Sequence, residues 1–448
     1  MAYEYDVAII GTGTSAYMAA YPCRNAGMKV AIIDSRPYGG TCSMRGCQPK
    51  KYFVAAADIA GGVSNMMQIG LKGIAEISWP ELVRAKDSFT GAVPGRTEKE
   101  FEKAGMKTMH GHAVFTGPNS LRIGDTEISS RSIIIATGAK PAALNIHGEE
   151  YLTTSDKFMD LKSLPGEILF LGGGYVSFEF AHVANAAGAK VTILQRGDRV
   201  LKAFDPDLVA KLVKSSEETG IRIKTNACVR GIRKQGSKYV VYCDDGPERG
   251  FETEMVVHGA GRVPDVDNLA LETGDVEYSE KGVIVNSYMQ SVSNPAVYAV
   301  GDAAATPFRL APKADMEGEI AAENIIRGNN VRADYALVPS VVFSRPPLSM
   351  AGIGEKGALE SGKKIRINKG DMHNWPSSKR IGQKHAAYKI LIDEENDQIL
   401  GAHILGKNSE ETINLFTLAM RFNLKTKDLK KVLWAYPTYT SEIKYMIG

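Results

Sequence analysis

The chain reads YDVAIIGTGTSA over residues 5–16. Its first half is a short apolar run rich in β-branched residues, and it closes in glycines before an alanine-rich stretch. This pattern predicts a strand, a tight turn and a helix. Gly11 and Gly13 allow a pyrophosphate to approach the helix N-terminus closely. Asp34 lies 21 residues after Gly13, where a carboxylate can accept hydrogen bonds from ribose hydroxyls. The sequence therefore predicts an adenine dinucleotide site here.

The same arrangement recurs from Ile168, where an apolar run ends in LGGG and is followed by YVSFEFAHVANAAG and KVTILQ. Two such units predict an α/β protein with two Rossmann-like nucleotide-binding domains. SDKFMDLKSLP reads as a polar connector between them, and the strands YKILIDEE and QILGAHIL lie in a third, α+β segment. We expect the first domain at 1–150 and 275–334, the second at 151–274 and the third at 335–448.

Composition excludes several classes of protein. The 448 residues are 44% apolar and 23% charged, enough for large cores, and the formal net charge is only +3. Nucleic acid is therefore not expected as a partner. No apolar run is long enough to span a bilayer, and the N-terminus lacks signal-peptide features, so we expect no membrane contact and a cytoplasmic location. Five cysteines do not form a secreted disulfide framework, which favours a catalytic disulfide.

Residues 39–51 read GGTCSMRGCQPKK and place Cys42 and Cys47 five positions apart. In a regular helix, five residues rise about 7.5 Å. A disulfide tolerates a Cα separation of roughly 4.4 to 6.8 Å. The helix must therefore begin between the cysteines or be distorted, and Gly46 and Pro49 suit such an irregular turn. A cysteine near a helix N-terminus also gains thiolate stabilisation from the dipole.

This segment resembles the active-site motif of the pyridine nucleotide-disulfide oxidoreductases. The resemblance implies that Cys42 is the interchange thiol that attacks the substrate, and that Cys47 lies against a flavin and forms the charge-transfer complex. Lys51 would lie near flavin N5 with Glu179 as its carboxylate partner. Tyr175 would cover the flavin until the nicotinamide displaces it.

The resemblance also implies FAD as the first cofactor. The ATG at Ala136 to Gly138 and the Gly301-Asp302 pair match the family's remaining flavin contacts, with the aspartate on the ribityl chain. The full set of expected cofactor contacts is Gly11, Gly13, Thr14, Ser15, Ala16, Asp34, Ser35, Arg36, Gly40, Thr41, Cys42, Cys47, Lys51, His112, Ala113, Ala136, Thr137, Gly138, Gly172, Gly174, Tyr175, Val176, Glu179, Arg196, Lys202, Gly261, Arg262, Gly301, Asp302, Leu310 and Ala311.

The second dinucleotide site lacks the usual carboxylate. Gln195 lies 21 residues after Gly174, in the position where an NAD site has an acidic residue. The following QRGDRVLK supplies Arg196, Arg199 and Lys202, and a cationic pocket favours the 2′-phosphate of NADPH. In NADPH-using members of the family, basic residues stand where Arg196 and Lys202 stand here. We therefore expect NADPH rather than NADH.

The C-terminal segment departs from the family. The expected HPT-x-x-E, whose histidine comes from the partner subunit, reads AYPTYTSE here, and no histidine follows His403. Tyr436 takes the histidine position, and Glu442 lies one residue beyond the usual glutamate. A phenol with a pKa of about 10 can donate a proton to a leaving thiolate but is a poor base at neutral pH. Lys50 replaces a serine of the family motif, and nothing in the sequence explains that change.

These observations predict an NADPH:disulfide oxidoreductase that forms a homodimer, carries no resident metal and acts on a low-molecular-weight disulfide. Three alternatives stay open. The first is a reductase of a metal ion, quinone or electrophile, although mercuric reductases add a C-terminal cysteine pair that this chain lacks. The second is a lipoamide dehydrogenase that uses NADH, and the third is a flavoprotein without enzymatic activity.

Overall fold

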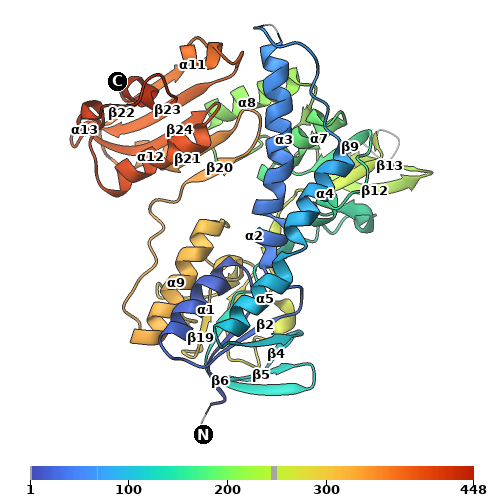
Figure 1. Ribbon diagram of the computed structural model, residues 1–448, viewed down its shortest axis with the longest axis vertical. Coiled ribbons are helices and arrows are strands. Elements are labelled where there is room, and N and C mark those ends of the chain that lie inside the picture. The colour runs from blue at the N-terminus through green and yellow to red at the C-terminus, as the bar shows by residue number, and fades with distance from the viewer. Residues whose placement is uncertain (1–2, 68, 244–249) are drawn as a thin grey trace. The chain divides into compact units, whose positions relative to one another are not determined.

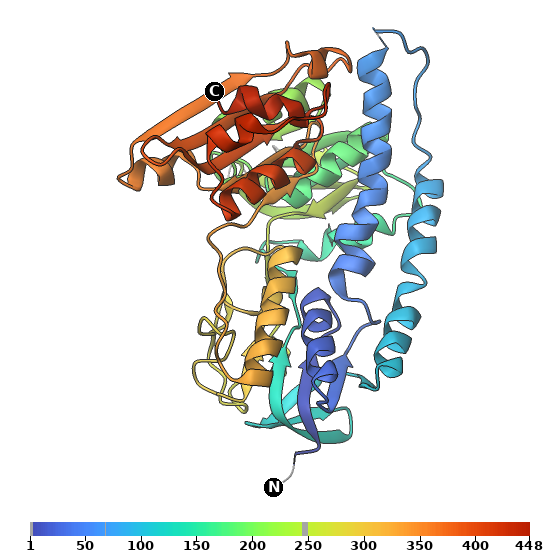
Figure 2. The same cartoon turned by 60° about the vertical axis from the view of Figure 1, so that its left-hand side comes forward.

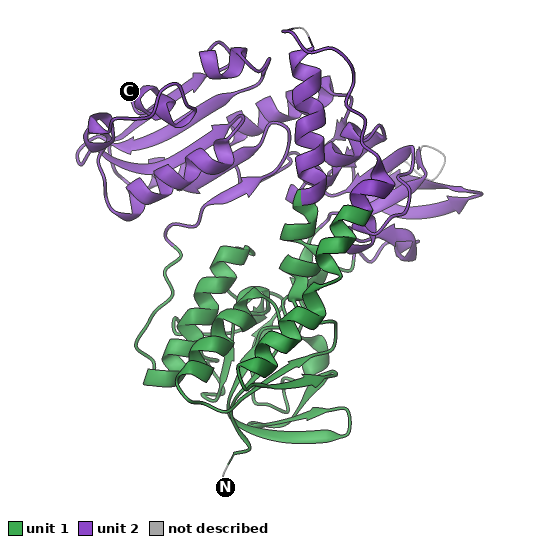
Figure 3. Cartoon of the chain, viewed as in Figure 1, with its two compact units in different colours: residues 1–51, 84–143, 261–335 green, residues 52–83, 144–260, 336–448 purple. Residues whose placement is uncertain are grey.

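The computed structural model describes residues 3–67, 69–243 and 250–448 (Figure 1). The chain forms two compact units (Figure 3). Unit 1 contains residues 1–51, 84–143 and 261–335, and unit 2 contains residues 52–83, 144–260 and 336–448. The expected division into three domains with the boundaries given above stays a prediction.

Unit 1 is built on a mixed sheet with the order β3-β2-β1-β6-β5-β4, and β19 also pairs with β6. The end of β6 runs parallel to β1 and β19, whereas its beginning pairs antiparallel with β5. Ile9 lies opposite Ile32 and Ile134, and all three side chains are fully buried. The strands are β1 (Tyr5–Ile10), β2 (Val30–Asp34), β3 (Lys107–His110), β4 (Ala113–Gly117), β5 (Ser120–Ile123), β6 (Thr126–Ile135) and β19 (Val297–Ala299).

Two helices of unit 1, α1 (Thr14–Asn25) and α9 (Ala311–Arg327), lie side by side (Figures 1 and 2). Alanines on both helices pack in the same core as the β1 and β2 side chains, which allows the close approach. The unit also contains α2 (Gly40–Arg45), α5 (Val93–Lys103), the β7 (Ala139–Pro141) and β16 (Arg262–Pro264) pair, the β17 (Tyr278–Ser279) and β18 (Gly282–Val283) pair, and the 3₁₀ turns η2 (Asp267–Leu269) and η3 (Gly301–Ala303).

Two helices, α3 (Cys47–Met66) and α4 (Trp79–Thr90), contribute residues to both units. The first sheet of unit 2 is parallel, with the order β11-β10-β9-β15-β8. Its elements are η1 (Glu149–Tyr151), β8 (Leu152–Thr153), α6 (Ser155–Met159), β9 (Glu167–Leu171), α7 (Tyr175–Ala186), β10 (Lys190–Leu194), α8 (Pro206–Glu218), β11 (Arg222–Lys224) and β15 (Met255–His258). The predicted second strand-turn-helix unit is therefore confirmed by β9, α7 and β10.

The rest of unit 2 contains two antiparallel sheets, in the orders β12-β13-β14 and β20-β21-β24-β23-β22. These strands are β12 (Val229–Gln235), β13 (Lys238–Cys243), β14 (Phe251–Thr253), β20 (Ser340–Val342), β21 (Leu348–Gly352), β22 (Ile365–Asp371), β23 (Ala387–Asp393) and β24 (Gln398–Leu405). The C-terminal helices are α10 (Glu355–Glu360), α11 (Pro376–Lys379), α12 (Ser409–Arg421), α13 (Thr426–Lys431), η4 (Thr440–Glu442) and α14 (Ile443–Met446).

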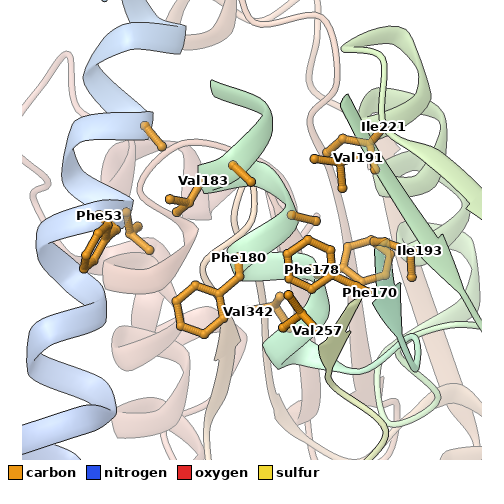
Figure 4. Packing of buried hydrophobic residues seen from close by; sticks show 14 of the residues in the cluster. Phe53, Phe170, Phe178, Phe180, Val183, Val191, Ile193, Ile221, Val257 and Val342 are labelled. Carbon is orange, nitrogen blue, oxygen red and sulfur yellow. The ribbon is translucent and has the colours of Figure 1, made fainter. Parts of the chain in front are cut away.

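A large cluster of buried aromatic and aliphatic side chains forms one core of unit 2 (Figure 4). Phe53 of α3 and Phe170 of β9 belong to it together with Phe178 of α7, and all three are fully buried. Phe158 is also fully buried in this core, and it lies in α6. The prediction that residues 155–165 form a polar connector was therefore wrong for their first half, because that segment folds as a short helix that packs into the core. Among the described residues, no helix is long and apolar enough to cross a membrane.

Candidate active site

The two predicted redox cysteines lie on either side of a helix break. Cys42 belongs to α2, Cys47 begins α3, and Gly46 between them has φ −139° and ψ −115°, outside the helical region. The spacing argument, which required either a helix start between the cysteines or a distorted helix, is confirmed. The break brings the thiols of Cys42 and Cys47 into hydrogen-bond contact.

The surroundings of Cys42 favour its protonated form. The hydrogen bond to Cys47 and burial raise the pKa of the Cys42 thiol, and the negative charge of Asp315 adds to the effect. Cys42 therefore holds its proton more tightly than an ordinary cysteine while the two thiols touch.

Glycines form a side-chain-free cradle around the turn after β1. Gly11 has φ +116°, and a Cβ atom there would lie 2.3 Å from the backbone oxygen of Ala136. Gly40 has φ +65°, and its Cβ would lie 2.3 Å from the Cα of Gly13. Gly13 is also the N-cap of α1, and no side chain caps that helix. The first N–H groups of α1 are thus left for an anionic group such as a pyrophosphate.

Asp34 is held at the end of β2 by contacts that the sequence analysis missed. The Thr12 hydroxyl donates to Asp34 Oδ2 at 2.5 Å, and the Arg36 N–H donates to Oδ1 at 2.9 Å. Thr12 Oγ1 also accepts the N–H of Gly39 at 3.1 Å. A hydroxyl residue between two turn glycines was the available signal. Thr12 therefore ties the glycine turn to the carboxylate expected to bind ribose.

Two predicted flavin contacts place polar groups in largely buried surroundings. Thr137 Oγ1 is buried and has no hydrogen-bond partner among the described residues. Burial raises the pKa of Asp302, although Lys313, Arg309 and Arg262 oppose the shift. Thr137 follows β6 and Asp302 follows β19, which are neighbouring parallel strands, so both lie at the same sheet edge. Buried polar groups normally have partners, and the hydroxyl groups of FAD fit these two residues.

A buried ion pair, also missed from the sequence, fixes the loop that carries Asp302. Lys313 and Glu317 are fully buried on α9 with their charged atoms 2.9 Å apart. Glu317 Oε2 accepts the N–H of Gly301 at 2.8 Å, and Lys313 Nζ donates to its carbonyl oxygen at 3.1 Å. Oppositely charged residues four apart on a helix were the signal in the sequence. The pair thus sets the position of η3 and of Asp302.

The other predicted cofactor contacts of unit 1 lie at strand ends, turns and helix starts. Arg262 donates to the carbonyl oxygen of Ala139, and its own carbonyl oxygen accepts from Arg309. The remaining residues occupy the first turn of α1 (Thr14, Ser15, Ala16), the end of β2 (Ser35, Arg36), α2 (Thr41), the start of β4 (His112, Ala113), the end of β6 (Ala136, Gly138), the start of β16 (Gly261) and the start of α9 (Leu310, Ala311).

Unit 2 repeats the glycine turn. Gly172 has φ +95°, and a Cβ atom there would lie 2.5 Å from the backbone oxygen of Gly259. Gly174 is the N-cap of α7, again without a capping side chain. The geometry is that of the turn at Gly11, so the N-terminus of α7 can also receive a phosphate group.

The segment after β10 folds back onto this turn. Gln195 Oε1 accepts the N–H of Gly173 at 2.8 Å, and the Leu201 N–H donates to the Gly173 carbonyl at 2.8 Å. Lys202 Nζ lies 3.8 Å from Asp198, and both side chains are largely exposed. Arg196 is exposed in the same loop. The loop therefore carries cations at the glycine turn, and an amide replaces the carboxylate.

Residues predicted to act on the flavin are divided between the units. Tyr175 begins α7 and is 44% exposed, Val176 follows it, and Glu179 lies one turn later. Glu179 is 1% exposed, and its Oε1 accepts the N–H of Phe343 at 3.0 Å. Lys51 lies on the unit 1 part of α3. The pairing of Lys51 with Glu179 stays a prediction.

The residues at the family's acid position do not form a pair. Tyr436 is 75% exposed, and the Lys444 ammonium lies 6.0 Å from its ring centre. Glu442 is half-buried and accepts hydrogen bonds from Ser377. Burial raises the pKa of Glu442, and those hydrogen bonds partly offset the shift. Tyr436 is therefore accessible to another molecule, whereas Glu442 is bound within the C-terminal part of unit 2.

Comparison with known families matches nearly the whole chain. Residues 5–318 match the model of the pyridine nucleotide-disulphide oxidoreductases, and residues 338–447 match that of their dimerisation domain. The chain belongs to this family. It is thus an oxidoreductase of a group that uses FAD and a pyridine nucleotide and acts on sulfur groups.

Curated relatives in the family carry different activities. The chain is 31% identical to the glutathione reductase of Burkholderia cepacia, with 98% of both chains covered. It is 30% identical to the mercuric reductase of Staphylococcus aureus over 98% of this chain and 81% of the relative. The dihydrolipoyl dehydrogenase of Thermus scotoductus is 30% identical over 97% and 95% of the two chains.

The fold matches a solved structure over its full length. The HOCl-induced flavoprotein disulfide reductase RclA of Escherichia coli superposes with a TM-score of 0.89 and covers 99% of both chains, at 24% identity. This likeness supports the expected fold, with two nucleotide-binding parts and a C-terminal α+β part.

Proposed function

We propose that the protein is an NADPH-dependent, FAD-containing reductase of low-molecular-weight disulfides. The observation that carries the proposal is the pair of thiols of Cys42 and Cys47, which touch across the break at Gly46. A dithiol in contact can close to a disulfide and reopen, which is a two-electron exchange. FAD, when bound, supplies the ring that passes electrons from the nicotinamide to this pair.

The chain's own sulfurs carry the exchange with the substrate. Two electrons and two protons open the Cys42–Cys47 disulfide to two thiols. The Cys42 sulfur then attacks one sulfur of the substrate disulfide, and the first substrate thiol leaves with a proton. The Cys47 sulfur attacks Cys42, which releases the second substrate thiol and restores the protein disulfide. One substrate disulfide thus becomes two thiols.

Residues in both units support the cofactor assignment. Asp34 would bind the adenosine ribose of FAD, and Thr137 and Asp302 would hydrogen-bond to its hydroxyl-bearing part. Glu179, held by the Phe343 N–H, would orient Lys51 beside the flavin ring. These residues would hold FAD in the proposed complex.

NADPH is the proposed reductant because Gln195 replaces the carboxylate and cations lie beside it. The double variant Arg196→Ala/Lys202→Ala should raise the KM for NADPH by about tenfold to a hundredfold, since each lost charge-assisted hydrogen bond weakens binding. The KM for NADH should change little. Lys190→Ala, an 83% exposed residue at the start of β10, is the matched control. A preference of the wild type for NADH would favour a lipoamide dehydrogenase instead.

The proposal implies a homodimer in which the C-terminal segment reaches the active site of the partner subunit. The dimerisation-domain match at 338–447 and the exposure of Tyr436 support this arrangement. Tyr436 would then donate the proton to the first leaving thiolate.

An anaerobic titration tests the proposal as a whole. NADPH should bleach the bound flavin of the purified protein, and a low-molecular-weight disulfide such as oxidised glutathione should restore the absorbance. Cys42→Ser should abolish turnover of the disulfide while leaving flavin reduction in place. Full disulfide turnover by Cys42→Ser or Cys47→Ser would contradict the proposal.

A second candidate function is reduction of a metal ion, a quinone or an electrophile. It is favoured by one observation, the tyrosine at the position of the family's acid histidine. Tyr436→Phe separates the two functions. Loss of disulfide turnover with retained quinone reduction would identify Tyr436 as a disulfide-specific acid. Unchanged turnover of both would show that Tyr436 is not the acid, and faster turnover of quinones than of any disulfide by the wild type would favour the second function.

A further inference from the structure

Unit 2 contains a pocket of about 1110 Å³. None of the residues assigned above to the active site or the cofactor sites lines this pocket. We name it the Arg345 pocket. It lies between the C-terminal half of α3, the ends of α7 and α8, the segment 345–347 and the segment 373–385. Its volume is comparable to that of pockets that hold organic ligands, which is about 300–1,000 Å³.

The pocket carries more positive than negative charge. Its two carboxylates are already engaged: Asp58 binds Lys407 at 2.7 Å, and Glu218 lies 2.8 Å from His385. Four cationic residues line the pocket, compared with two carboxylates. The cations are Arg345, Lys379, Lys384 and Lys407. Two positive charges are thus in excess, which favours an anion.

Arg345 is the cation best placed to bind such a group. A Cβ atom at Gly61 would lie 1.0 Å from Arg345 Nη2, so the guanidinium occupies the space that a side chain at Gly61 would fill. Burial lowers the pKa of Arg345, and Asp58 only partly counters the shift. Within the described residues, the Arg345 guanidinium has no hydrogen-bond partner, and Asp58 is bound to Lys407. A partly buried guanidinium without a partner is costly unless a ligand binds it.

The glycine at position 61 also indicates that the position of the Arg345 guanidinium is specific. Glycine in the interior of a helix destabilises it relative to alanine. Gly61 lies inside the 20-residue helix α3 and is buried beneath Arg345, whereas its neighbour Gly62 is exposed. The helix therefore gives up stability where the guanidinium needs room.

The other wall of the pocket is apolar. Its side chains are Met66, Met67, Ile69, Ile74 and Ile381. We infer that the Arg345 pocket is a second ligand site that binds a small organic anion, with its phosphate, sulfonate or carboxylate group on Arg345 and its apolar body against this wall.

The site is separate from the proposed NADPH site. The glycine turn at Gly172 precedes the N-terminus of α7, whereas Asn185 and Ala186 at the C-terminal end of α7 line the pocket. A helix of 12 residues is about 18 Å long, so one ligand of moderate size does not fill both sites. This inference does not depend on the proposed reaction.

Ligand-observed NMR on the FAD-loaded protein tests the site, with NADP⁺ at saturation to block the nucleotide site. Phenyl phosphate, which combines an anion with an apolar body, should show saturation transfer. Benzyl alcohol should bind more weakly, and inorganic phosphate, measured as a competitor of phenyl phosphate, should as well. Arg345→Gln should weaken phenyl phosphate binding at least about tenfold, because a hydrogen-bonded charge is lost. Lys356→Gln, an 89% exposed cation on α10, should leave it unchanged.

A second variant keeps the test decisive if Arg345→Gln loses its FAD or melts early. Lys379→Gln/Lys384→Gln changes two exposed residues and should weaken binding several-fold without loss of the fold. Equal binding of phenyl phosphate and benzyl alcohol to the wild type would overturn the inference. Unchanged affinity in a folded Arg345→Gln variant, or in the double variant, would overturn it as well.

Discussion

Two residues of unit 1, Asp302 and Thr137, have polar groups whose burial is unfavourable for stability. Asp302 is a carboxylate whose pKa burial raises, and Thr137 has a buried hydroxyl without a partner among the described residues. Groups of this kind destabilise the folded state until a partner arrives. Both groups would gain hydrogen-bond partners in the proposed FAD site.

Asp302→Asn should move stability and FAD affinity in opposite directions. A carboxyl group whose pKa is raised on folding destabilises the protein as pH rises from its ordinary value of 3.8 through the folded value. The FAD-free variant should thus melt at a higher temperature than FAD-free wild type at pH 7, and the difference should vanish in acid. FAD affinity should fall about tenfold, because a hydrogen bond to a charged group is weakened.

Melting curves of the FAD-free proteins and flavin fluorescence titrations measure the two effects. Asp125→Asn, in the exposed turn between β5 and β6, is the control and should change neither quantity. A variant of Asp302 that binds FAD as the wild type does would remove this residue from the flavin site.

At the scale of elements, helix breaks and glycine turns place the chemistry. The turns at Gly11 and Gly172 bring a helix start against the end of a neighbouring strand in each unit. The break at Gly46 does the same for the two thiols. At Gly46 a Cβ atom would lie 2.8 Å from the Thr41 carbonyl oxygen and 3.2 Å from the Thr41 side chain. The junction of α2 and α3 therefore has no space for a larger residue.

Gly46→Ala should displace Thr41 and, with it, Cys42. We expect a loss of about 1–3 kcal/mol in stability, typical of overpacking, and at least about tenfold lower disulfide turnover. Gly95→Ala in α5 is the matched control, because nothing lies within 4 Å of its Cβ position. The control should gain about 0.5–1 kcal/mol, since alanine favours a helix. Equal melting temperatures and turnover in the two variants would show that the junction tolerates a methyl group.

For the whole molecule, local patterns predicted the framework but not the long-range contacts. The βαβ units were visible because periodicity and glycine spacing are local signals. Phe158 was misassigned because five residues of a short helix carry too little periodicity to show which side is buried. The contact between Arg345 and Gly61 joins residues far apart in sequence, and no local pattern indicates it. Contacts that fix sites were therefore the part that sequence could not supply.

A buried charge network in unit 2 is a further contact of this kind. Lys389 on β23 is 1% exposed and lies 2.7 Å from Asp205, which is equally buried and caps α8. Asp207 and Glu355 lie 2.8 and 2.6 Å from the same ammonium. Burial lowers the pKa of Lys389, but the hydrogen bonds to these carboxylates outweigh it and hold the pKa above its ordinary value. The network therefore joins α8 of the parallel-sheet part to the C-terminal sheet.

Lys389→Met should destabilise the protein by about 3–5 kcal/mol, because it leaves Asp205 buried without its counter-charge. Lys389→Met/Asp205→Asn should recover part of this loss, whereas Lys364→Met, whose 75% exposed side chain pairs with Glu394, should cost less than about 1 kcal/mol. A lysine with a raised pKa stabilises the fold at all pH values below its unfolded pKa and loses this effect only as pH rises through the folded value. The gap between wild type and Lys389→Met in thermal melts should therefore persist at neutral pH and narrow only in strongly alkaline solution. A single variant no less stable than the double variant would mean that Asp205 does not need the ammonium.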